Sequence, residues 1–526
     1  MGKHLKRRDF LIALGIEAAA LAVTGCRGIF KKKTEFPNIV YIIADDMGYG
    51  DVGCLNPECK IPTPYMNSLA EQGMVFKDAH AGASVCTPTR YGILTGRYSW
   101  RSRLKSGVLG SYSPPLIKRD RMTVASLLKH YGYSTACVGK WHLGWNWRYR
   151  EGYVEGKKKE YFVDYTKPII NGPLSRGFDY FFGIPASLDM PPYVYVENRK
   201  VIKPASETTE GSSGYRFYRS GPIAPDFEHS EVMLRFTEKA VGFIDQHAKT
   251  KSRAPFFLYF PFSAPHTPIL PNERFVNKSG IGAYGDFVFE CDWVVGQIMK
   301  ALKKHGLTEN TLIIVTSDNG CSPQAGFEDL AEHGHFPSYH FRGYKADIYE
   351  GGHRIPFIAR WPNHIKPGTE CRAMICLTDL LATVADFTGY ELPDNAGEDS
   401  VSILPYFLGK DEEPVRDAVI HHSINGSFAI RKGKWKLELC PGSGGWSHPT
   451  PKEAKKLNLP QFQLYDLSKD IEEKNNLYNE RPNVVSELIS ILQEYVERGR
   501  STPGAPQENV GKVNIFKKAG KTGYPL

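Results

Sequence analysis

Three apolar runs stand out in the hydrophobic pattern of the chain; two of them are followed at once by polar residues, and the third ends near His266. They are rich in β-branched and aromatic residues and extend over Asn38 to Ala44, Phe256 to Phe260, and Thr311 to Ser317. A short apolar run without alternation is typical of a strand buried on both faces, as in a parallel sheet covered by helices. The pattern therefore predicts a sheet built around these strands.

Between the predicted strands, apolar residues recur at helical spacing. Helices are predicted over Tyr65 to Gln72, Thr123 to Tyr131, and Asp286 to His305, and a glycine follows each of them. Glycine just past the last periodic residue is a common helix stop. Strands that alternate with helices predict an α/β fold. Residues 145 to 230 are rich in Gly, Pro, Tyr and charge and are predicted to form long loops over a functional site.

The pattern changes after about residue 405. Short strands are predicted over His421 to Ile430, Lys434 to Leu439, and Phe462 to Asp466, with a helix over Val484 to Arg498. These elements indicate a smaller C-terminal α+β domain. We therefore predict a main domain over residues 37–404 and a second domain over residues 405–526.

The N-terminus has the features of an export address. Lys6-Arg7-Arg8-Asp9-Phe10-Leu11 resembles a twin-arginine signal, and Val23-Thr24-Gly25-Cys26 resembles a lipobox. The apolar stretch between them is too short to span a bilayer comfortably. We predict a signal over residues 1–26, a basic linker over residues 27–36, and a periplasmic or cell-surface lipoprotein tethered to a membrane by lipid on Cys26. The alternative is a buried N-terminal helix with a chance cysteine.

Composition and charge are those of a globular protein with a basic surface. The 526 residues are 41% hydrophobic and 23% charged, with a formal net charge of +9. The densest basic runs, Lys31 to Lys33 and Lys157 to Lys159, carry no interleaved aromatic residues. We therefore predict no nucleic-acid partner, whereas an anionic substrate fits the sign of the charge.

The ten cysteines show no zinc-binding pattern. An exported protein can form disulfides, and the close pairs Cys54/Cys59 and Cys371/Cys376 are candidates. Free buried thiols are the alternative.

Polar side chains follow two of the predicted strands directly. Asp45 and Asp46 close the first strand, and Asp318 and Asn319 close the last. The carboxyl ends of parallel strands form one edge of a sheet, which is where α/β folds place their sites. Carboxylates packed there would repel one another, and a cation resolves that conflict. An all-oxygen set suits calcium or magnesium, whereas an isolated Asp-Asp pair is more often a turn or a helix cap.

A helix start is predicted at Cys86. Pro88 suits the first turn of a helix, and Gly96 suits its end. Unpaired N–H groups and the helix dipole favour negative charge at this end, and Arg90 lies one turn later. The segment thus indicates an anion site beside a reactive sulfur. For an isolated cysteine, a small buried hydrophobic residue is the alternative.

The same segment resembles the signature of the formylglycine sulfatases in the alkaline-phosphatase superfamily, most closely the arylsulfatase A and N-acetylgalactosamine-6-sulfatase type. Further motifs of that family occur in order. They are Asp45-Asp46, Cys86-Thr87-Pro88-Thr89-Arg90, Leu94-Thr95-Gly96-Arg97, Gly139-Lys140-Trp141-His142-Leu143-Gly144, Pro265-His266-Thr267-Pro268, Ser317-Asp318-Asn319-Gly320, Arg342-Gly343-Tyr344-Lys345 and Glu350-Gly351-Gly352. The resemblance implies an alkaline-phosphatase-like fold, with a large, mixed, mostly parallel sheet flanked by helices.

The resemblance also implies a sulfuric ester hydrolase in which a maturation enzyme converts Cys86 to a formylglycine aldehyde. One calcium ion is expected to bind Asp45, Asp46, Cys86, Asp318 and Asn319. The hydrated aldehyde would attack sulfur, while Arg90, Lys140 and Lys345 neutralise the sulfate oxygens. His266, with Lys345, would protonate the leaving alcohol, and His142 would take a proton as sulfate is expelled.

A sulfated glycan is the expected substrate, since the chain has an export signal, long loops and many aromatic residues. Two alternatives are a phosphoesterase or phosphonate hydrolase of the same superfamily and a non-catalytic lipoprotein that binds sulfated glycans. A phosphate dianion normally requires a second metal, for which the sequence shows no further acidic cluster.

Several other residues are candidates for the substrate pocket. The histidines could line it or cap loops, and the aromatic residues could stack on sugar rings or pack in the core: His333, His335, His340, Trp145, Trp147, Tyr193 and Tyr195. Tyr344 stands where the family often has glycine, and a larger side chain there would reshape the pocket.

Overall fold

Strand β1 (Asn38–Asp45) lies at the centre of the main sheet, and all eight of its residues are buried. The computed structural model describes residues 36–156, 158–250, 254–410 and 413–518. The predicted signal, Cys26 and all but the last residue of the predicted linker lie outside this range. None of the helices within it is long and apolar enough to cross a membrane.

The main sheet has ten strands in the order β13-β2-β12-β11-β1-β10-β4-β5-β6-β7. Its centre, from β11 to β5, is parallel, and the pairings of β12 with β11 and β2 are antiparallel. This is the large, mixed, mostly parallel sheet that the sequence predicts. The strands are β2 (Met74–Phe76), β4 (Ser134–Lys140), β5 (Tyr180–Ile184), β6 (Val196–Glu197), β7 (Lys200–Val201), β10 (Phe256–Pro265), β11 (Thr311–Ser317), β12 (Phe357–Arg360) and β13 (Thr369–Cys371).

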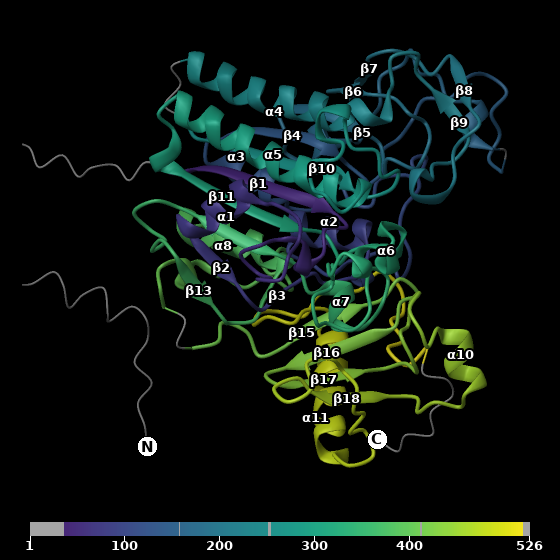
Figure 1. Ribbon diagram of the computed structural model, residues 1–526, viewed down its shortest axis with the longest axis vertical. Helices are drawn as coiled ribbons and strands as arrows, with labels where there is room; N and C mark the ends of the chain where they lie inside the picture. Colours follow the sequence, from purple (N-terminus) through teal and green to yellow (C-terminus); the bar gives the residue numbers. More distant parts are fainter. Residues whose placement is uncertain (1–35, 157, 251–253, 411–412, 519–526) are drawn as a thin grey trace, which may run out of the picture. The chain divides into compact units, whose positions relative to one another are not determined.

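Helices form two groups that pack against this sheet (Figure 1). One group is α1 (Pro64–Glu71), α4 (Val232–Lys249) and α5 (Ala283–Lys304), and the other is α2 (Cys86–Thr95), α3 (Val124–His130) and α8 (Leu380–Thr388). Short helices α6 (Phe327–Glu332), α7 (Glu350–His353) and α9 (Leu404–Phe407) lie in the connections. The three helices predicted from apolar spacing are α1, α3 and α5, each within a few residues of its expected bounds.

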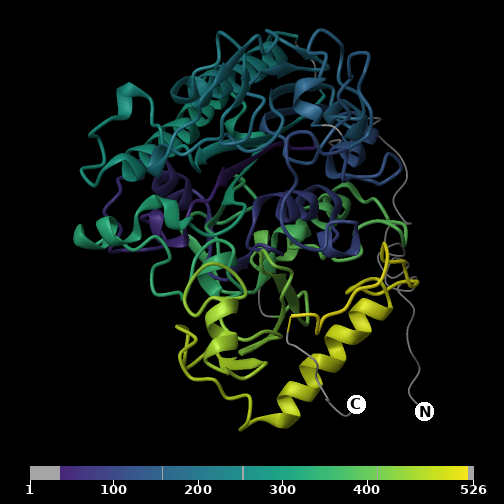
Figure 2. The ribbon, with the colours of Figure 1, turned by 90° about the vertical axis from the view of Figure 1, so that its right-hand side faces the viewer.

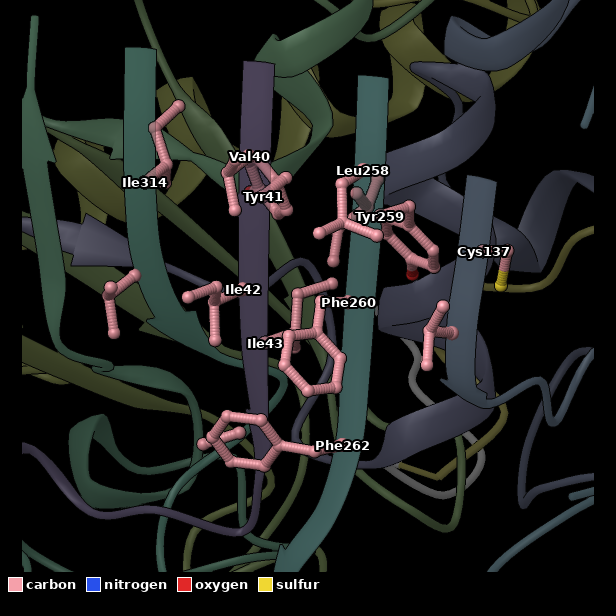
Figure 3. Close-up of a cluster of buried hydrophobic side chains, with 14 of the residues drawn as sticks. Val40, Tyr41, Ile42, Ile43, Cys137, Leu258, Tyr259, Phe260, Phe262 and Ile314 are labelled. Atoms are coloured by element: carbon pink, nitrogen blue, oxygen red, sulfur yellow. The ribbon is translucent and has the colours of Figure 1, made fainter. Parts of the chain in front are cut away.

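Side chains of the central strands interlock between the helices (Figure 3). Tyr41 of β1 pairs in register with Tyr259 of β10, and their rings stack with centroids 6.4 Å apart. Ile42 and Ile43 are fully buried. Complete burial of such a side chain contributes about 1.5–3 kcal/mol, so the unbroken apolar runs anchor the strand ends that carry the polar residues.

Two parts of the sheet were not predicted. β4 ends in Lys140, and its sequence, Ser134 to Lys140, has only three apolar residues in a row, flanked by polar residues and a glycine. β5, β6 and β7 lie within residues 145–230, which were predicted to be loops. β5 pairs with β4 over five residues. These segments become strands because neighbouring strands supply their hydrogen bonds and cover, which a local pattern does not reveal.

The C-terminal region contains the smaller antiparallel sheet, in the order β15-β16-β17-β18. Its strands are β15 (Val419–His422), β16 (Phe428–Lys432), β17 (Trp435–Glu438) and β18 (Gln463–Asp466). Helix α11 (Pro482–Glu497), the long yellow helix in Figure 2, packs on β16 and β17, and α10 (Pro451–Lys456) lies between β17 and β18 in sequence. The single strand predicted over His421 to Ile430 is wrong, because a turn at residues 423–427 folds it into the β15–β16 hairpin.

Nine cysteines are described, and all are free thiols. The proposed pairs Cys54/Cys59 and Cys371/Cys376 are therefore not disulfides in this structure. Both members of the second pair are fully buried, which is the alternative that the sequence left open.

Three histidines form a cluster that links the C-terminal sheet to β3 (Ala79–His80) and α7. His80 belongs to β3, which pairs with β14 (Ile375–Cys376), while His353 ends α7 and His421 lies in β15. The Nδ1 atoms of His80 and His353 are 3.1 Å apart, and the rings of His353 and His421 stack with centroids 3.7 Å apart at an angle of 8°.

This histidine cluster does not fit a metal ion, although its nitrogen atoms lie close together. The lone pairs of two parallel stacked rings lie in separate planes and cannot converge on one ion. Lys436 Nζ also lies 3.1 Å from His353 Nε2, and Arg431 lies 2.9 Å from His80 Nε2. Burial, with the positive charge of Lys436, holds the pKa of His353 well below its usual range, and the pKa of His421 is likewise depressed by burial.

These neutral histidines predict a loss of stability in mild acid. In the unfolded chain they bind protons below pH ~6.5, whereas the folded chain keeps them neutral. Stability should therefore be fully present above pH ~6.5 and fall below it, by about 1.4 kcal/mol per pH unit for each histidine. Urea unfolding at pH 7 and pH 5 measures the fall.

The variant His421→Asn isolates the contribution, because it should make the fall shallower. The exposed His364 provides the control, and His364→Gln should leave the slope unchanged. Equal slopes for all three proteins would contradict the prediction.

Candidate active site

Cys86 is the first residue of α2, as the sequence predicts. Val85 before it is extended, and Gly96 ends the helix in the left-handed conformation with φ 61°. All ten residues of α2 are buried. The helix therefore directs its N-terminal N–H groups toward the edge of the main sheet, where they favour an anion.

The carboxyl ends of β1 and β11 bring the predicted acidic residues together. The backbone N–H of Asp46 donates to Asp318 Oδ1 over 3.2 Å, and Asn319 Nδ2 donates to Asp46 Oδ1 over 2.7 Å. All four predicted side chains, including Asp45, are 0–1% exposed. They are neighbours because β1 and β11 pair in parallel register, Ala44 opposite Ser317.

Three buried cations neutralise these carboxylates. Lys140, at the end of β4, contacts both oxygens of Asp45 over 2.9 and 2.7 Å. Arg90 Nε donates to Asp318 Oδ2 over 2.9 Å, and Lys345 Nζ donates to Asp46 Oδ2 over 2.7 Å. Burial opposes the charge on Arg90 and Lys345, but the neighbouring aspartates hold both pKa values above their usual range.

His266 lies between the acidic cluster and Cys86. It follows β10 directly, and one of its ring nitrogens lies within 4.8 Å of the Cys86 sulfur. Its Nδ1 donates to Thr267 O over 2.6 Å, and its Nε2 lies 3.6 Å from Asp46 Oδ2. Burial and Lys345 lower the pKa of His266, but Asp46 and Asp45 outweigh them and raise it to about 9.

The pKa of His142 is shifted in the opposite direction to that of His266. His142 Nε2 lies 2.7 Å from the carbonyl oxygen of Leu109, which can only accept, so the proton is on Nε2. Its Nδ1 is buried and has no hydrogen-bond partner within the described ranges. Burial and Lys140 hold the pKa of His142 well below its usual range, which leaves a neutral ring with a free lone pair.

The donor set fits a hard cation. One ligand atom from each of Asp45, Asp46, Cys86 and His266 lies within 4.8 Å of the others. Asn319 Oδ1 is buried and has no hydrogen-bond partner among the described residues, so one amide oxygen is available as a ligand. Three aspartates balance Arg90 and two lysines, so a divalent cation would leave the site positive, as an anionic substrate requires.

Left-handed backbone occurs at three positions of the site. Asp46, His142 and Ala346, which follows Lys345, have φ values of 68°, 52° and 79°. Such conformations cost roughly 1–3 kcal/mol each and persist only where the surrounding structure enforces them. At Asp46 and His142, this conformation redirects the chain at the residue that carries the functional side chain.

Ser187 is a residue of the site that the sequence did not reveal. Its Oγ accepts from Lys140 Nζ over 3.1 Å and lies 3.2 Å from His266 Nε2, so it bridges two predicted catalytic residues. It comes from the loop after β5, and its sequence neighbourhood carries no motif. Only the pairing of β5 with β4 brings it here.

Other pocket candidates lie elsewhere. The four aromatic residues are at most 4% exposed and pack in the core, so sugar stacking by Trp145, Trp147, Tyr193 and Tyr195 is not supported. His335 is buried and contacts Asp51 over 2.9 Å, and His333 Nδ1 lies 2.9 Å from Asp329 O. The His340 ring is tilted against the Tyr339 ring and packs edge-on against Phe341. These histidines therefore fit the alternative of structural loop contacts. Tyr344 is partly exposed and packs on Phe327.

An α/β sheet whose strand ends join carboxylates, cations and a helix-borne thiol defines a hydrolase of the alkaline-phosphatase-like class. Comparison with family models makes the assignment specific: the sulfatase model matches residues 37–390, and the chain belongs to the sulfatase family. It is thus a sulfuric ester hydrolase, and the phosphoesterase and non-catalytic alternatives are not favoured.

Known sulfatases are similar in sequence to this chain over almost its whole length. An N-acetylgalactosamine-6-O-sulfatase of Bacteroides thetaiotaomicron is 35% identical over 90% of this chain and 97% of its own length. Human arylsulfatase A is 32% identical, covering 93% of this chain and 90% of its own. A solved structure from work on the metabolism of multiple glycosaminoglycans by B. thetaiotaomicron has a TM-score of 0.76 at 34% identity, and covers 88% of this chain and 99% of that one.

Gly139 provides a test of how the site is positioned. It has φ 128°, and a Cβ there would lie 2.0 Å from the carbonyl oxygen of Pro261 in β10. Gly139→Ala should therefore separate β4 from β10 and displace Lys140. The free energy of unfolding should fall by ~1–3 kcal/mol or more. Thermal unfolding and activity of the variant measure both effects.

Gly132→Ala is the matched control. Gly132 also has a positive φ, 82°, but a Cβ there meets nothing within 4 Å. This variant should keep its activity and lose less stability. If Gly139→Ala were as active and as stable as Gly132→Ala, the close approach of β4 and β10 would not position Lys140.

Proposed function

We propose that this enzyme removes sulfate from a sulfated glycan, using a formylglycine made from Cys86 and one calcium ion. The observation that carries the proposal is the convergence of Cys86 with Asp45, Asp46 and His266 within 4.8 Å. The names of the relatives, among them the N-acetylgalactosamine-6-O-sulfatase, support a sulfated sugar as the substrate class. A formylglycine-generating enzyme is the partner that maturation requires.

The ligands that we assign to calcium are Asp45, Asp46, Asp318, Asn319 and residue 86. When bound, calcium supplies positive charge that polarises residue 86 and the sulfate oxygens. The formylglycine hydrate supplies one hydroxyl for attack on sulfur and a second whose deprotonation releases sulfate. All remaining steps fall to side chains that the structure describes.

Binding of the sulfate group falls to the buried cations. Arg90, Lys140 and Lys345 contact Asp318, Asp45 and Asp46, and the last two aspartates cluster with residue 86. Fixed positive groups in a site without water require no reorganisation as charge develops, and this is usually the largest contribution to catalysis. The N-terminus of α2 adds N–H donors to the same anion.

Two histidines divide the proton transfers. His266 is held with its Nδ1 on Thr267 O, so its Nε2 is the atom that can protonate the leaving alcohol. His142 holds its own proton on Leu109 O and keeps a free Nδ1, so it can accept the proton of the second hydroxyl. Their opposite pKa shifts suit an acid and a base.

We also propose that the enzyme is exported and anchored through lipid on Cys26. The twin-arginine-like segment and the sequence Val23-Thr24-Gly25-Cys26 support this location. A polymeric sulfated glycan outside the cell would then meet the enzyme at the membrane face.

The role of Cys86 predicts a modified residue in active protein. Peptide mass spectrometry should find the aldehyde or its hydrate at residue 86, and lipid on the cysteine at residue 26. Cys86→Ala should lower sulfate release by at least ~10³-fold, as expected for loss of a nucleophile. Cys291→Ala, which changes another buried thiol, should remain active. Fully active protein with only unmodified thiol at residue 86 would overturn the mechanism.

Calcium predicts a reversible loss of activity on chelation. Activity should vanish in EGTA and return with calcium more completely than with magnesium. Calcium at ~100 times its dissociation constant should also stabilise the folded protein by about 2.7 kcal/mol, which thermal unfolding can detect.

Asn319→Ala removes one ligand oxygen without changing the charge, so the calcium-dependent stabilisation should shrink. Asn363→Ala, in an exposed loop, is the control and should keep the full effect. An unchanged calcium response in the Asn319 variant would remove Asn319 from the ligand set.

A further inference from the structure

A cavity of about 630 Å³ lies beside the catalytic residues and has no role in the mechanism described above. Two of its walls are the segment from Val108 to Tyr112 and the pair Met190-Pro191. Its volume lies within the range of about 300–1,000 Å³ typical of small-ligand sites.

The wall formed by Val108 to Tyr112 contacts His142 and the residue next to Cys86. The backbone N–H of Leu109 donates to Thr87 Oγ1 over 3.2 Å, one residue after Cys86, and Leu109 O accepts from His142 Nε2 over 2.7 Å. A ligand in the cavity therefore lies against the segment that orients His142.

The wall formed by Met190 and Pro191 is linked through Ser187 to Lys140 and to His266, the proposed general acid. Met190 N–H donates to Ser187 O over 2.9 Å, and Ser187 Oγ contacts Lys140 Nζ and His266 Nε2. Ser111 Oγ donates to Met190 O over 3.2 Å and joins the two walls. Leu109 on one wall hydrogen-bonds His142, and Met190 on the other hydrogen-bonds Ser187, so both walls of the cavity adjoin residues of the active site.

Positive charge is available at the rim of the cavity. The side chain of Arg219 is 49% exposed and contacts Asp189 through one terminal nitrogen. Its Nε and second terminal nitrogen make no hydrogen bond among the described residues, so two donors can bind a ligand. Lys158 lies 6.0 Å from the Tyr161 ring, and Glu160 is the one acidic residue among those that line the cavity.

We propose that this cavity binds the sugar next to the sulfated one, and that Arg219 binds an anionic substituent on that neighbouring sugar. The substrate is then an acidic oligosaccharide rather than a sulfated monosaccharide. The planar guanidinium group suits a carboxylate or a second sulfate, since both accept two parallel hydrogen bonds. Tyr112 and Tyr161 add aromatic surface for a sugar ring. The inference rests on the proposed sulfatase activity toward glycans.

The test compares four substrates of the matured enzyme. They are a small aryl sulfate and three sulfated disaccharides whose neighbouring sugar is neutral, carries a carboxylate, or carries a second sulfate. The wild-type enzyme should show kcat/KM values about 10–100-fold higher for one or both acidic disaccharides than for the neutral one, as expected for a charge-assisted contact. The preferred acidic disaccharide identifies the anion.

The variant Arg219→Gln should lose this preference and keep its activity on the aryl sulfate. Arg219→Lys, which retains the charge opposite Asp189, should keep part of the preference and controls for a folding defect. Arg216→Gln is the matched control, because Arg216 is three residues away, stacks on Tyr215 and does not line the cavity.

Two results would overturn the inference: no wild-type preference for an acidic neighbour, or an equal loss of kcat/KM for all four substrates in Arg219→Gln. Failure of the proposed function is a different result, since the matured wild-type enzyme would then release no sulfate even from the aryl sulfate.

Discussion

The mutual neutralisation of three buried aspartates and three buried cations at one edge of the main sheet is the constraint on which the site depends. Each isolated charge would cost several kcal/mol to bury. Asp45 with Lys140, Asp46 with Lys345, and Asp318 with Arg90 make that burial tolerable. These ion pairs stabilise the folded state and also fix the three cations around the aspartates that cluster with residue 86, where we propose that a tetrahedral anion binds.

The site also concentrates strain that the rest of the fold must support. Asp46 and His142 adopt left-handed backbone conformations, and Gly139 allows β4 to approach β10 more closely than any side chain would permit. Well-packed parallel strands resist deformation, so they can hold such conformations. This explains why the functional residues lie at the ends of the most deeply buried strands, while the cavity that we assign to the neighbouring sugar is formed by loops, whose sequences can vary more freely.

The C-terminal region is hydrogen-bonded to the segment that carries Lys345. Ala346, next to Lys345, donates its backbone N–H to Ser84 O and accepts from Ile424 N–H in the β15–β16 turn. The smaller sheet thus supports Lys345 from behind, and the stacked histidines link it to β3 and α7.

The sequence by itself determined the α/β class, β1 and β11, the start of α2 at Cys86, and which acidic and basic residues lie together at the edge of the sheet. It could do so because unbroken apolar runs, helix stops and short motifs are local signals. Only the tertiary structure decided that β4 and β5 join the sheet, that His421 to Ile430 forms a hairpin, and that Trp145 and Tyr193 are core residues. It also decided that Ser187 contacts Lys140 and His266 and that Arg219 lines the cavity. These outcomes depend on contacts between residues distant in the chain, since burial and pairing partners are supplied by other segments, and no local pattern encodes them.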